Sequence, residues 1–335
     1  MQSIGGYFEL ADREPGRGFP HTEGILLNTG RNALEYILRS IREIRCVYLP
    51  YYTCEVVLEP LQKLQIPWRF YHINTHFEIE DDIRLGDCEY LIANNYFGLK
   101  DGYIRTLAER YGDRLIVDCA QAFFARPISG IKSFYSARKY VGVADGGMAY
   151  LGNERDGRVE VTETEWTAGH DNHLYIRKQF GAEAGFAAYQ ENEKRLDNQP
   201  IRWMSAATRS ILDHIDYENV VAKRRENYYT LHEALAEMNG LDLPGMDTFV
   251  CPMVYPLMTR KGIELRGKLI DNKVFVARYW PEALWPEDRG FECGLADDLV
   301  AIPCDQRYGK SDIKRIIQIS NGNNKTHNYP ISGKE

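Results

Sequence analysis

The chain has 335 residues, of which 44% are hydrophobic and 27% are charged, and its formal net charge is −7. These values are typical of a globular protein with one large and one smaller domain, and the acidic balance argues against nucleic acid as a partner. The sequence shows no signal-peptide pattern and no run of the roughly 20 apolar residues that a membrane span needs. Seven cysteines without a Cys-x-x-Cys pair suit a reducing compartment. We therefore expect a cytoplasmic protein with no membrane partner.

The first half of the chain has the pattern of an α/β core. Between residues 29 and 151, short β-rich runs alternate with helical patterns, as in βαβ units around a mostly parallel sheet. Asn28 or Thr29 is a suitable N-cap for the first helix. The elements expected here are a helix over 31–44, a strand over 46–49, a helix over 55–64 kinked at Pro60, strands over 68–71 and 90–93, a helix over 104–111 and a strand over 115–117.

The second half predicts a separate, smaller domain. The polar residues 153–200 indicate a loop and a mobile helix near the site, and a long helix is expected over 211–238, ending at Asn239-Gly240. We expect residues 1–240 to form the large domain with an N-terminal arm, 241–320 a small α+β domain and 321–335 a frayed tail. The elements expected in the small domain are strands over 249–254 and 274–277 and helices over 263–269 and 311–319.

Lys139 and Asp118 are the candidate catalytic residues. Lys139 follows Asp118 by 21 residues and precedes Gly146-Gly147 by seven. Asp118 directly follows an apolar run, so we expect it at the carboxyl end of a strand, where open α/β sheets place their ligands. Pyridoxal phosphate needs an amine that holds its aldehyde as a Schiff base and a carboxylate that keeps its pyridine nitrogen protonated. Because Lys139 and Asp118 could supply these groups, the arrangement suggests pyridoxal phosphate chemistry.

The start of the first helix is a candidate phosphate site. Gly30, Arg31 and Asn32 open this helix, and the free N–H groups and dipole of a helix N-terminus favour a bound phosphate. His170 and His173 have a spacing that metal ligands can show, but they stand in a polar segment without a third ligand. We therefore expect these histidines to be solvated, and we expect no metal site.

Four segments resemble, in order, the motifs of the DegT/DnrJ family of sugar aminotransferases. They are Thr29-Gly30-Arg31-Asn32-Ala33-Leu34, Leu49-Pro50-Tyr51-Tyr52-Thr53, Asp118-Cys119-Ala120-Gln121-Ala122, and Lys139 with Asp145-Gly146-Gly147. Weaker similarity extends the resemblance over most of the chain, at Arg202, Met204-Ser205, Lys223-Arg224-Arg225 and Ala301-Ile302-Pro303. The opening Gly5-Gly6-Tyr7-Phe8-Glu9-Leu10 is similar to a divergent branch associated with surface polysaccharide synthesis.

The resemblance implies both a fold and an activity. The fold is that of fold type I enzymes, an αβα three-layer large domain with a mostly parallel sheet and a small C-terminal α+β domain. The activity is that of a pyridoxal phosphate-dependent aminotransferase acting on a nucleotide-linked keto sugar, with glutamate as amino donor. It also implies a homodimer with active sites at the subunit interface.

The same resemblance assigns further cofactor-binding positions. Gln121 matches a glutamine near the phenolic oxygen of the cofactor, and either Ser133 or Ser136 matches a phosphate-binding serine, with Ser133 slightly preferred. Arg202 is the candidate for a group that reaches the cofactor of the neighbouring subunit. Cys54 stands where the family has an aromatic residue that stacks on the pyridine ring.

Two departures leave alternatives open. Without an aromatic residue at Cys54, stacking falls to Tyr51, Tyr52, Tyr96 or Phe97, and Asn95 takes the place of a histidine on the substrate side of the pocket. A related deoxygenase or dehydratase is one alternative function, although such relatives have histidine in place of the lysine. A noncatalytic protein that keeps the fold is the other.

Overall fold

The computed structural model describes residues 2–12, 18–154, 159–163, 169–280 and 291–322. Its centre is a seven-stranded sheet in the order β2-β8-β7-β6-β5-β3-β4, in which β8 alone runs antiparallel to its neighbours. This mixed, mostly parallel sheet confirms the predicted fold class. The strands are β2 (Ile25–Leu27), β3 (Cys46–Pro50), β4 (Trp68–Tyr71), β5 (Glu89–Asn94), β6 (Leu115–Cys119), β7 (Lys132–Ser136) and β8 (Gly147–Leu151).

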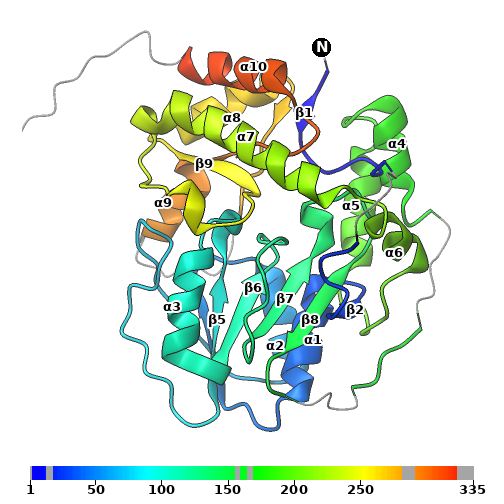
Figure 1. Cartoon of the computed structure of the whole chain (residues 1–335), viewed down its shortest axis with the longest axis vertical. Helices are drawn as coiled ribbons and strands as arrows, with labels where there is room; N and C mark the ends of the chain where they lie inside the picture. Colours follow the sequence, from blue (N-terminus) through cyan, green and yellow to red (C-terminus); the bar gives the residue numbers. More distant parts are fainter. Residues whose placement is uncertain (1, 13–17, 155–158, 164–168, 281–290, 323–335) are drawn as a thin grey trace, which may run out of the picture.

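Helices cover both faces of this sheet, which makes three layers (Figure 1). On one face, α1 (Gly30–Ser40) and α2 (Leu58–Lys63) bury alternate residues of the central strands, including Ile92, Ile116 and Phe134. On the other face, α3 (Asp101–Tyr111) contacts β6 and shares its core with Val117 and Tyr135. Because successive strand residues point to opposite faces, fully buried central strands become continuously apolar, as parallel strands commonly are.

The C-terminal elements gather beyond one end of the large sheet, together with the first residues of the chain (Figure 1). Two small sheets form there: β9 (Val254–Met258) pairs antiparallel with β11 (Leu299–Pro303), and β1 (Ile4–Gly5) pairs parallel with β10 (Val274–Phe275). The helices are α7 (Tyr217–Leu235), α8 (Gly262–Asp271), α9 (Phe291–Asp298) and α10 (Lys310–Asn321). The expected frayed tail lies almost entirely outside the described residues.

Short 3-10 helices complete the described elements. They are η1 (Glu55–Val57), η2 (Tyr96–Gly98), η3 (Gly112–Arg114), η4 (Ala137–Lys139), η5 (Ala236–Met238) and η6 (Met246–Thr248). The helix expected over 55–64 is therefore 3-10 in its first turn. Pro60 lies in the first turn of α2, where a missing N–H costs no helical hydrogen bond.

The prediction of one helix over 211–238 is wrong. The structure has α6 (Ala206–Leu212) and then α7, with a break at 213–216. Asp216 explains the break, because it caps the start of α7 by accepting from the Asn219 N–H at 3.1 Å. Aspartate favours such caps over helix interiors.

Two further predictions need correction. The strand expected over 249–254 begins only at Val254, because Arg225 on α7 binds the carbonyl oxygens of Phe249 and Val250 and so directs them toward the helix. The segment 153–200 carries two helices where a loop and one helix were predicted, namely α4 (Asn172–Phe180) and α5 (Phe186–Arg195).

Candidate active site

Asp118 lies at the carboxyl end of β6, level with Asn94 on β5 and Phe134 on β7. Its carboxylate is buried and accepts a hydrogen bond of 2.8 Å from the Ala120 N–H. Burial raises the pKa of Asp118 to about 6, against the opposing effects of that hydrogen bond and of the positive charge of Lys139. The side chain is therefore a desolvated acid that a nearby cation would stabilise in its charged form.

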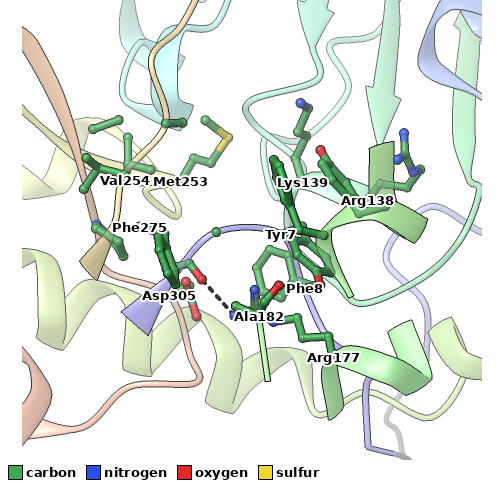
Figure 2. Close-up of a pocket in the computed structure, with 18 of the residues that line it drawn as sticks. Tyr7, Phe8, Arg138, Lys139, Arg177, Ala182, Met253, Val254, Phe275 and Asp305 are labelled. Atoms are coloured by element: carbon green, nitrogen blue, oxygen red, sulfur yellow. Dashed lines mark hydrogen bonds between the residues drawn. The ribbon is translucent and has the colours of Figure 1, made fainter. Parts of the chain in front are cut away.

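Lys139 lies in η4, which follows directly on β7. Its side chain is exposed to a cavity, and no hydrogen bond or ion pair binds it within the part of the chain that the structure describes. The neighbouring Arg138 is mostly buried and forms an ion pair with Glu193 on α5. Figure 2 shows the two side chains extending in different directions. Lys139 is thus the basic group available for chemistry here, whereas Arg138 is held by its partner.

The N-terminus of α1 lies beside the end of β7. Thr29 caps the helix by accepting from the Asn32 N–H at 3.0 Å, and the Asn32 side chain is fixed by the carbonyl of Gln199. A Cβ atom at Gly147 would lie 2.1 Å from the Thr29 carbonyl oxygen, so this glycine lets β8 approach the start of the helix. The first-turn N–H groups of α1 consequently face the region between β7 and β8.

The two candidate serines lie on opposite faces of β7. The Ser136 Cβ is 3.6 Å from where a Cβ of Gly30 would stand, which places Ser136 at the N-terminus of α1. Ser133 points to the other face and lines a small pocket with Asn95 and Asp101. The structure therefore brings Ser136, and not Ser133, to the candidate phosphate site.

Arg31 and Gln121 are both held by contacts within the chain. The Arg31 guanidinium binds Glu59 at 2.8 Å and Asp197 at 2.7 Å, so its side chain is engaged and its backbone N–H is the candidate phosphate donor. Gln121 accepts from the Phe97 N–H at 3.0 Å through its amide oxygen. This bond fixes the amide and leaves its NH₂ group as a donor.

The residues considered for the ring-stacking position are not gathered around Lys139. Cys54 is half-buried at the start of η1. Tyr51 stacks on Phe70, with ring centroids 4.9 Å apart. The three remaining aromatic residues are buried in one cluster that also contains Phe77, and they are Tyr52, Tyr96 and Phe97.

Asn95 and Arg202 also have contacts within the chain. Asn95 donates to Asp101 at 2.6 Å and accepts from the Lys100 N–H, which holds the start of α3. Arg202 continues the sheet edge beside β2, because its carbonyl accepts from the Asn28 N–H and its backbone bridges to Thr162. The Nε atom of Arg202 is buried and has no hydrogen-bond partner among the residues that the structure describes.

A cavity with a volume of about 570 Å³, which was not predicted from the sequence, lies beside Lys139. Lys139 lies in its wall together with the N-terminal residues Tyr7 and Phe8, with Arg177 from α4 and with residues from α5 and the C-terminal elements (Figure 2). The glycine-rich N-terminal motif was the one sequence signal near this cavity, and it was interpreted only as a resemblance, without a position in the fold. The prediction that the histidines are solvated is wrong for His173, which is buried in this wall, and burial lowers its pKa to about 4.

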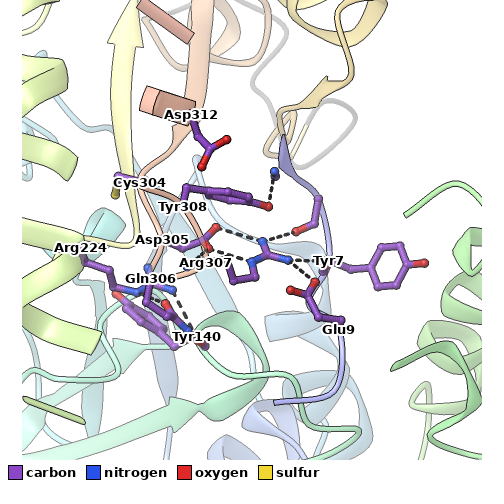
Figure 3. Close-up of polar contacts among 12 residues, drawn as sticks. Tyr7, Glu9, Tyr140, Arg224, Cys304, Asp305, Gln306, Arg307, Tyr308 and Asp312 are labelled. Atoms are coloured by element: carbon purple, nitrogen blue, oxygen red, sulfur yellow. Dashed lines mark hydrogen bonds and ion pairs between the residues drawn. The ribbon is translucent and has the colours of Figure 1, made fainter. Parts of the chain in front are cut away.

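Figure 3 shows the polar network that holds the N-terminal arm against the C-terminal elements. The Arg307 guanidinium binds Asp305 at 2.8 Å, Glu9 at 2.9 Å and the Tyr7 carbonyl at 3.1 Å. Burial disfavours the charge of Asp305, but the adjacent Arg307 outweighs it and lowers the pKa of Asp305. The arm is therefore fixed by buried, paired charges, and it forms a stable wall of the cavity.

No protein-family model matches the sequence, and no curated protein sequence is significantly similar to it. Solved structures are similar in fold. DesV from S. venezuelae, solved in complex with a ketimine intermediate, has a TM-score of 0.65 at 16% identity over 91% of this chain and 85% of DesV. A DegT DnrJ EryC1 StrS aminotransferase from Brucella abortus has a TM-score of 0.60 at 16% identity, over 90% of this chain and 86% of its own. DesI, solved in the presence of its TDP-sugar product, has a TM-score of 0.60 at 15% identity, over 90% of this chain and 81% of DesI.

The chain therefore has the fold of the fold type I aminotransferases. More narrowly, the similarity covers most of the chain and is to the DegT/DnrJ/EryC1/StrS sugar aminotransferases, so the predicted resemblance is confirmed at the level of the fold. Proteins with this fold bind pyridoxal phosphate. In the described part of this chain no helix is long and apolar enough to cross a membrane.

The site residues are chemically suited to pyridoxal phosphate. Asp118 is a buried carboxylate that lacks a hydrogen-bonded cation among the described residues, and Lys139 is an amine without a partner there. The close approach of β8 at Gly147 leaves the α1 N-terminus and Ser136 side by side, as a phosphate requires. A carboxylate, an amine and a helix N-terminus are the three groups that this cofactor needs.

Proposed function

We propose that the protein is a pyridoxal phosphate-dependent aminotransferase. The observation that carries the proposal is the pairing of an unengaged amine, Lys139, with a buried carboxylate, Asp118, at the carboxyl end of a mostly parallel sheet. When bound, pyridoxal phosphate supplies an electron-withdrawing ring that stabilises negative charge on a substrate carbon, and this permits exchange of an amino group.

Lys139 would anchor the cofactor and move protons. Its exposure to the cavity supports both roles, because an amine that is unpaired and reachable by solvent can attack a carbonyl and afterwards accept a proton. The ion pair of Arg138 with Glu193 keeps that neighbouring cation from competing for the same position.

Asp118 would hold the proton of the pyridine nitrogen. A carboxylate whose pKa is about 6 in a buried site gains most from a cation placed beside it, and the pyridine ring would bring that cation when protonated. Gln121 would donate from its fixed amide to the phenolic oxygen.

The N-terminus of α1 would bind the cofactor phosphate. The backbone N–H groups of Gly30 and Arg31 and the Ser136 hydroxyl are the proposed donors, because the Asn32 N–H is already engaged by the Thr29 cap. Ser136 replaces Ser133 because of the face of β7 on which it lies. Arg202 remains the proposed contribution from a neighbouring subunit in a homodimer, supported by its unpartnered Nε atom beside Asn28.

The substrate proposal rests on the similar proteins. DesI was solved in the presence of its TDP-sugar product, which supports a nucleotide-linked keto sugar as the amino acceptor here. A role in surface polysaccharide synthesis is proposed from the resemblance of the N-terminal motif Gly5-Gly6-Tyr7-Phe8-Glu9-Leu10. Glutamate is the proposed amino donor.

An absorption experiment tests the proposal. The full chain is incubated with pyridoxal phosphate, freed of excess cofactor, and then mixed with glutamate. A working aminotransferase retains an absorption band in the visible region that shifts into the near ultraviolet when glutamate is added. A protein that binds the cofactor but shows no shift with glutamate has a different amino donor or no transaminase activity, and a protein that retains no cofactor contradicts the proposal.

A further inference from the structure

The cavity beside Lys139 contains a buried cation whose hydrogen-bonding capacity is incompletely used. This cation is Arg177 on α4, which is 6% exposed and lines the cavity. Its Nε donates to Glu9 at 2.7 Å and its Nη2 donates to the Gly5 carbonyl at 2.8 Å. Among the described residues, its Nη1 is buried and has no hydrogen-bond partner of ordinary length and angle. Because buried donors are almost always paired in folded proteins, this atom indicates a ligand position.

The N-terminal arm packs closely against Arg177 and β10 because two glycines lie there. A Cβ atom on Gly6 would stand 3.2 Å from Nη1, and φ at this residue is +71°. A Cβ atom on Gly5 would stand 2.1 Å from the Phe275 carbonyl oxygen, so any larger residue would push the arm off β10. The paired glycines of the N-terminal motif thus allow the arm to pack closely, and a side chain at Gly6 would crowd the Nη1 atom.

Neighbouring groups fix the orientation of the guanidinium. Its Cζ lies 4.7 Å from the centroid of the Tyr7 ring, which covers one face of the cation. The Tyr7 hydroxyl is itself anchored, because it donates to the Ala182 carbonyl at 2.9 Å. Since Glu9 holds the opposite edge, Arg177 is preorganised and loses little freedom when it binds a ligand.

The charges that line the cavity favour an anion. Among the described residues of its lining, four carry a cationic side chain, at positions 138, 139, 177 and 224, and three carry a carboxylate, at positions 183, 193 and 305. Each of the carboxylates is already paired, with Lys273, Arg138 and Arg307 respectively. An anion that enters the cavity therefore meets cations that retain unused donors, and no unpaired carboxylate of this lining repels it.

We propose that Arg177 forms an anion subsite that holds a carboxylate or phosphate group of the substrate that reacts at Lys139. This inference rests on the proposed function, because that function makes Lys139 the reacting amine. Two substrates carry such a group: the nucleotide-linked sugar has a diphosphate, and the amino donor has carboxylates. Arg177 is then a specificity-determining residue that positions the substrate and takes no part in proton transfer.

Isothermal titration calorimetry on the full chain tests the subsite, with thymidine diphosphate and L-glutamate as separate probes. The variants are Arg177→Gln, Arg177→Lys and the control Lys178→Gln. The control removes the same charge from the next position of α4, where the side chain is partly exposed and pairs with Asp12 outside the cavity. The urea midpoint of each variant shows whether it is folded.

One probe should bind the wild-type chain and the control equally and bind Arg177→Gln about 10- to 100-fold more weakly, as expected for loss of a charge-assisted hydrogen bond. The affinity of Arg177→Lys should lie between these values, because lysine keeps the positive charge but lacks the planar set of guanidinium N–H donors. Loss for thymidine diphosphate alone assigns the subsite to a phosphate, and loss for glutamate alone assigns it to a carboxylate. If Arg177→Gln does not fold, the affinities of Arg177→Lys and of the wild-type chain are compared instead, and weaker binding by Arg177→Lys supports the subsite.

The inference is overturned if neither probe binds the wild-type chain, or if folded Arg177 variants bind both probes as the control does. Its failure is distinguishable from failure of the proposed function. A chain that binds thymidine diphosphate through Arg177 but retains no pyridoxal phosphate would keep the subsite and lose the aminotransferase. If the chain is an active aminotransferase but the Arg177 variants bind both probes with wild-type affinity, the proposed function stands and the anion subsite is lost.

Discussion

Replacement of Asp118 by Asn should stabilise the cofactor-free protein while it weakens the effect of the cofactor. Burial raises the pKa of Asp118 from its ordinary value of 3.8 to about 6. The folded chain thus keeps this proton to a higher pH than the unfolded chain does. Between these pH values the unfolded state binds fewer protons, so the contribution of Asp118 to the free energy of unfolding falls as the pH rises.

The size of the effect follows from the pKa change. At about 1.4 kcal/mol for each pKa unit, the buried charge costs about 3 kcal/mol of stability above pH 6. An asparagine keeps the acceptor for the Ala120 N–H and carries no charge, so Asp118→Asn should recover that amount. For a chain of this length, with an unfolding entropy of roughly 2.1 cal/mol/K for each residue, the expected rise in Tm at pH 7 is about 4 °C.

The assay is thermal unfolding at pH 4 and at pH 7, with and without pyridoxal phosphate. Asp118→Asn and the wild-type chain should have similar Tm values at pH 4, and the variant should be more stable at pH 7 without cofactor. The cofactor should stabilise the wild-type chain more than the variant, because only the carboxylate pairs with a protonated pyridine nitrogen.

Asp101→Asn is the matched control. Burial also raises the pKa of Asp101, but this carboxylate accepts from Asn95 and from the Val250 N–H on the face of the sheet away from α1. Its replacement should leave the cofactor-induced shift in Tm unchanged. Asp118 has neither of these effects if Asp118→Asn is no more stable than the wild-type chain at pH 7 without cofactor and both chains show the same cofactor-induced shift in Tm; either result alone contradicts the corresponding role.

Four further substitutions test the assigned roles. Lys139→Ala should abolish the visible absorption of the loaded protein, and a retained band with turnover would exclude Lys139. Ser136→Ala should weaken pyridoxal phosphate binding about 10-fold, and Ser133→Ala should leave it unchanged, as fluorescence titration can show; the opposite order would contradict the phosphate site. A mixed dimer of Lys139→Ala and Arg202→Ala chains should regain one working site, whereas full activity of the Arg202→Ala homodimer would remove Arg202 from the site.

The parts of the site that depend on local sequence were predictable. Asp118 follows an apolar run, and the Thr29 cap and Gly30 mark the start of α1, so both positions could be derived from the pattern of neighbouring residues. Strand ends and helix caps are determined by nearby residues, and the topology of parallel sheets brings them to one edge.

The parts that depend on long-range contacts were not predictable from that pattern. The choice between Ser133 and Ser136 needs the faces of β7, which are fixed by pairing with β6 and β8. Arg177 meets Glu9 across 168 residues of sequence, so neither residue signals the other locally. The break before α7 arises because aspartate capping overrides a helical pattern that continues through it.

Peptide mapping after borohydride reduction tests the central claim, that Lys139 is the amine that binds pyridoxal phosphate. Borohydride converts the bond between an amine and the cofactor into one that survives proteolysis, and mass spectrometry then identifies the modified lysine. We expect one phosphopyridoxyl group for each chain, on Lys139, and none on this peptide in Lys139→Ala. A label on another lysine, or a protein that takes no label after incubation with the cofactor, would contradict it.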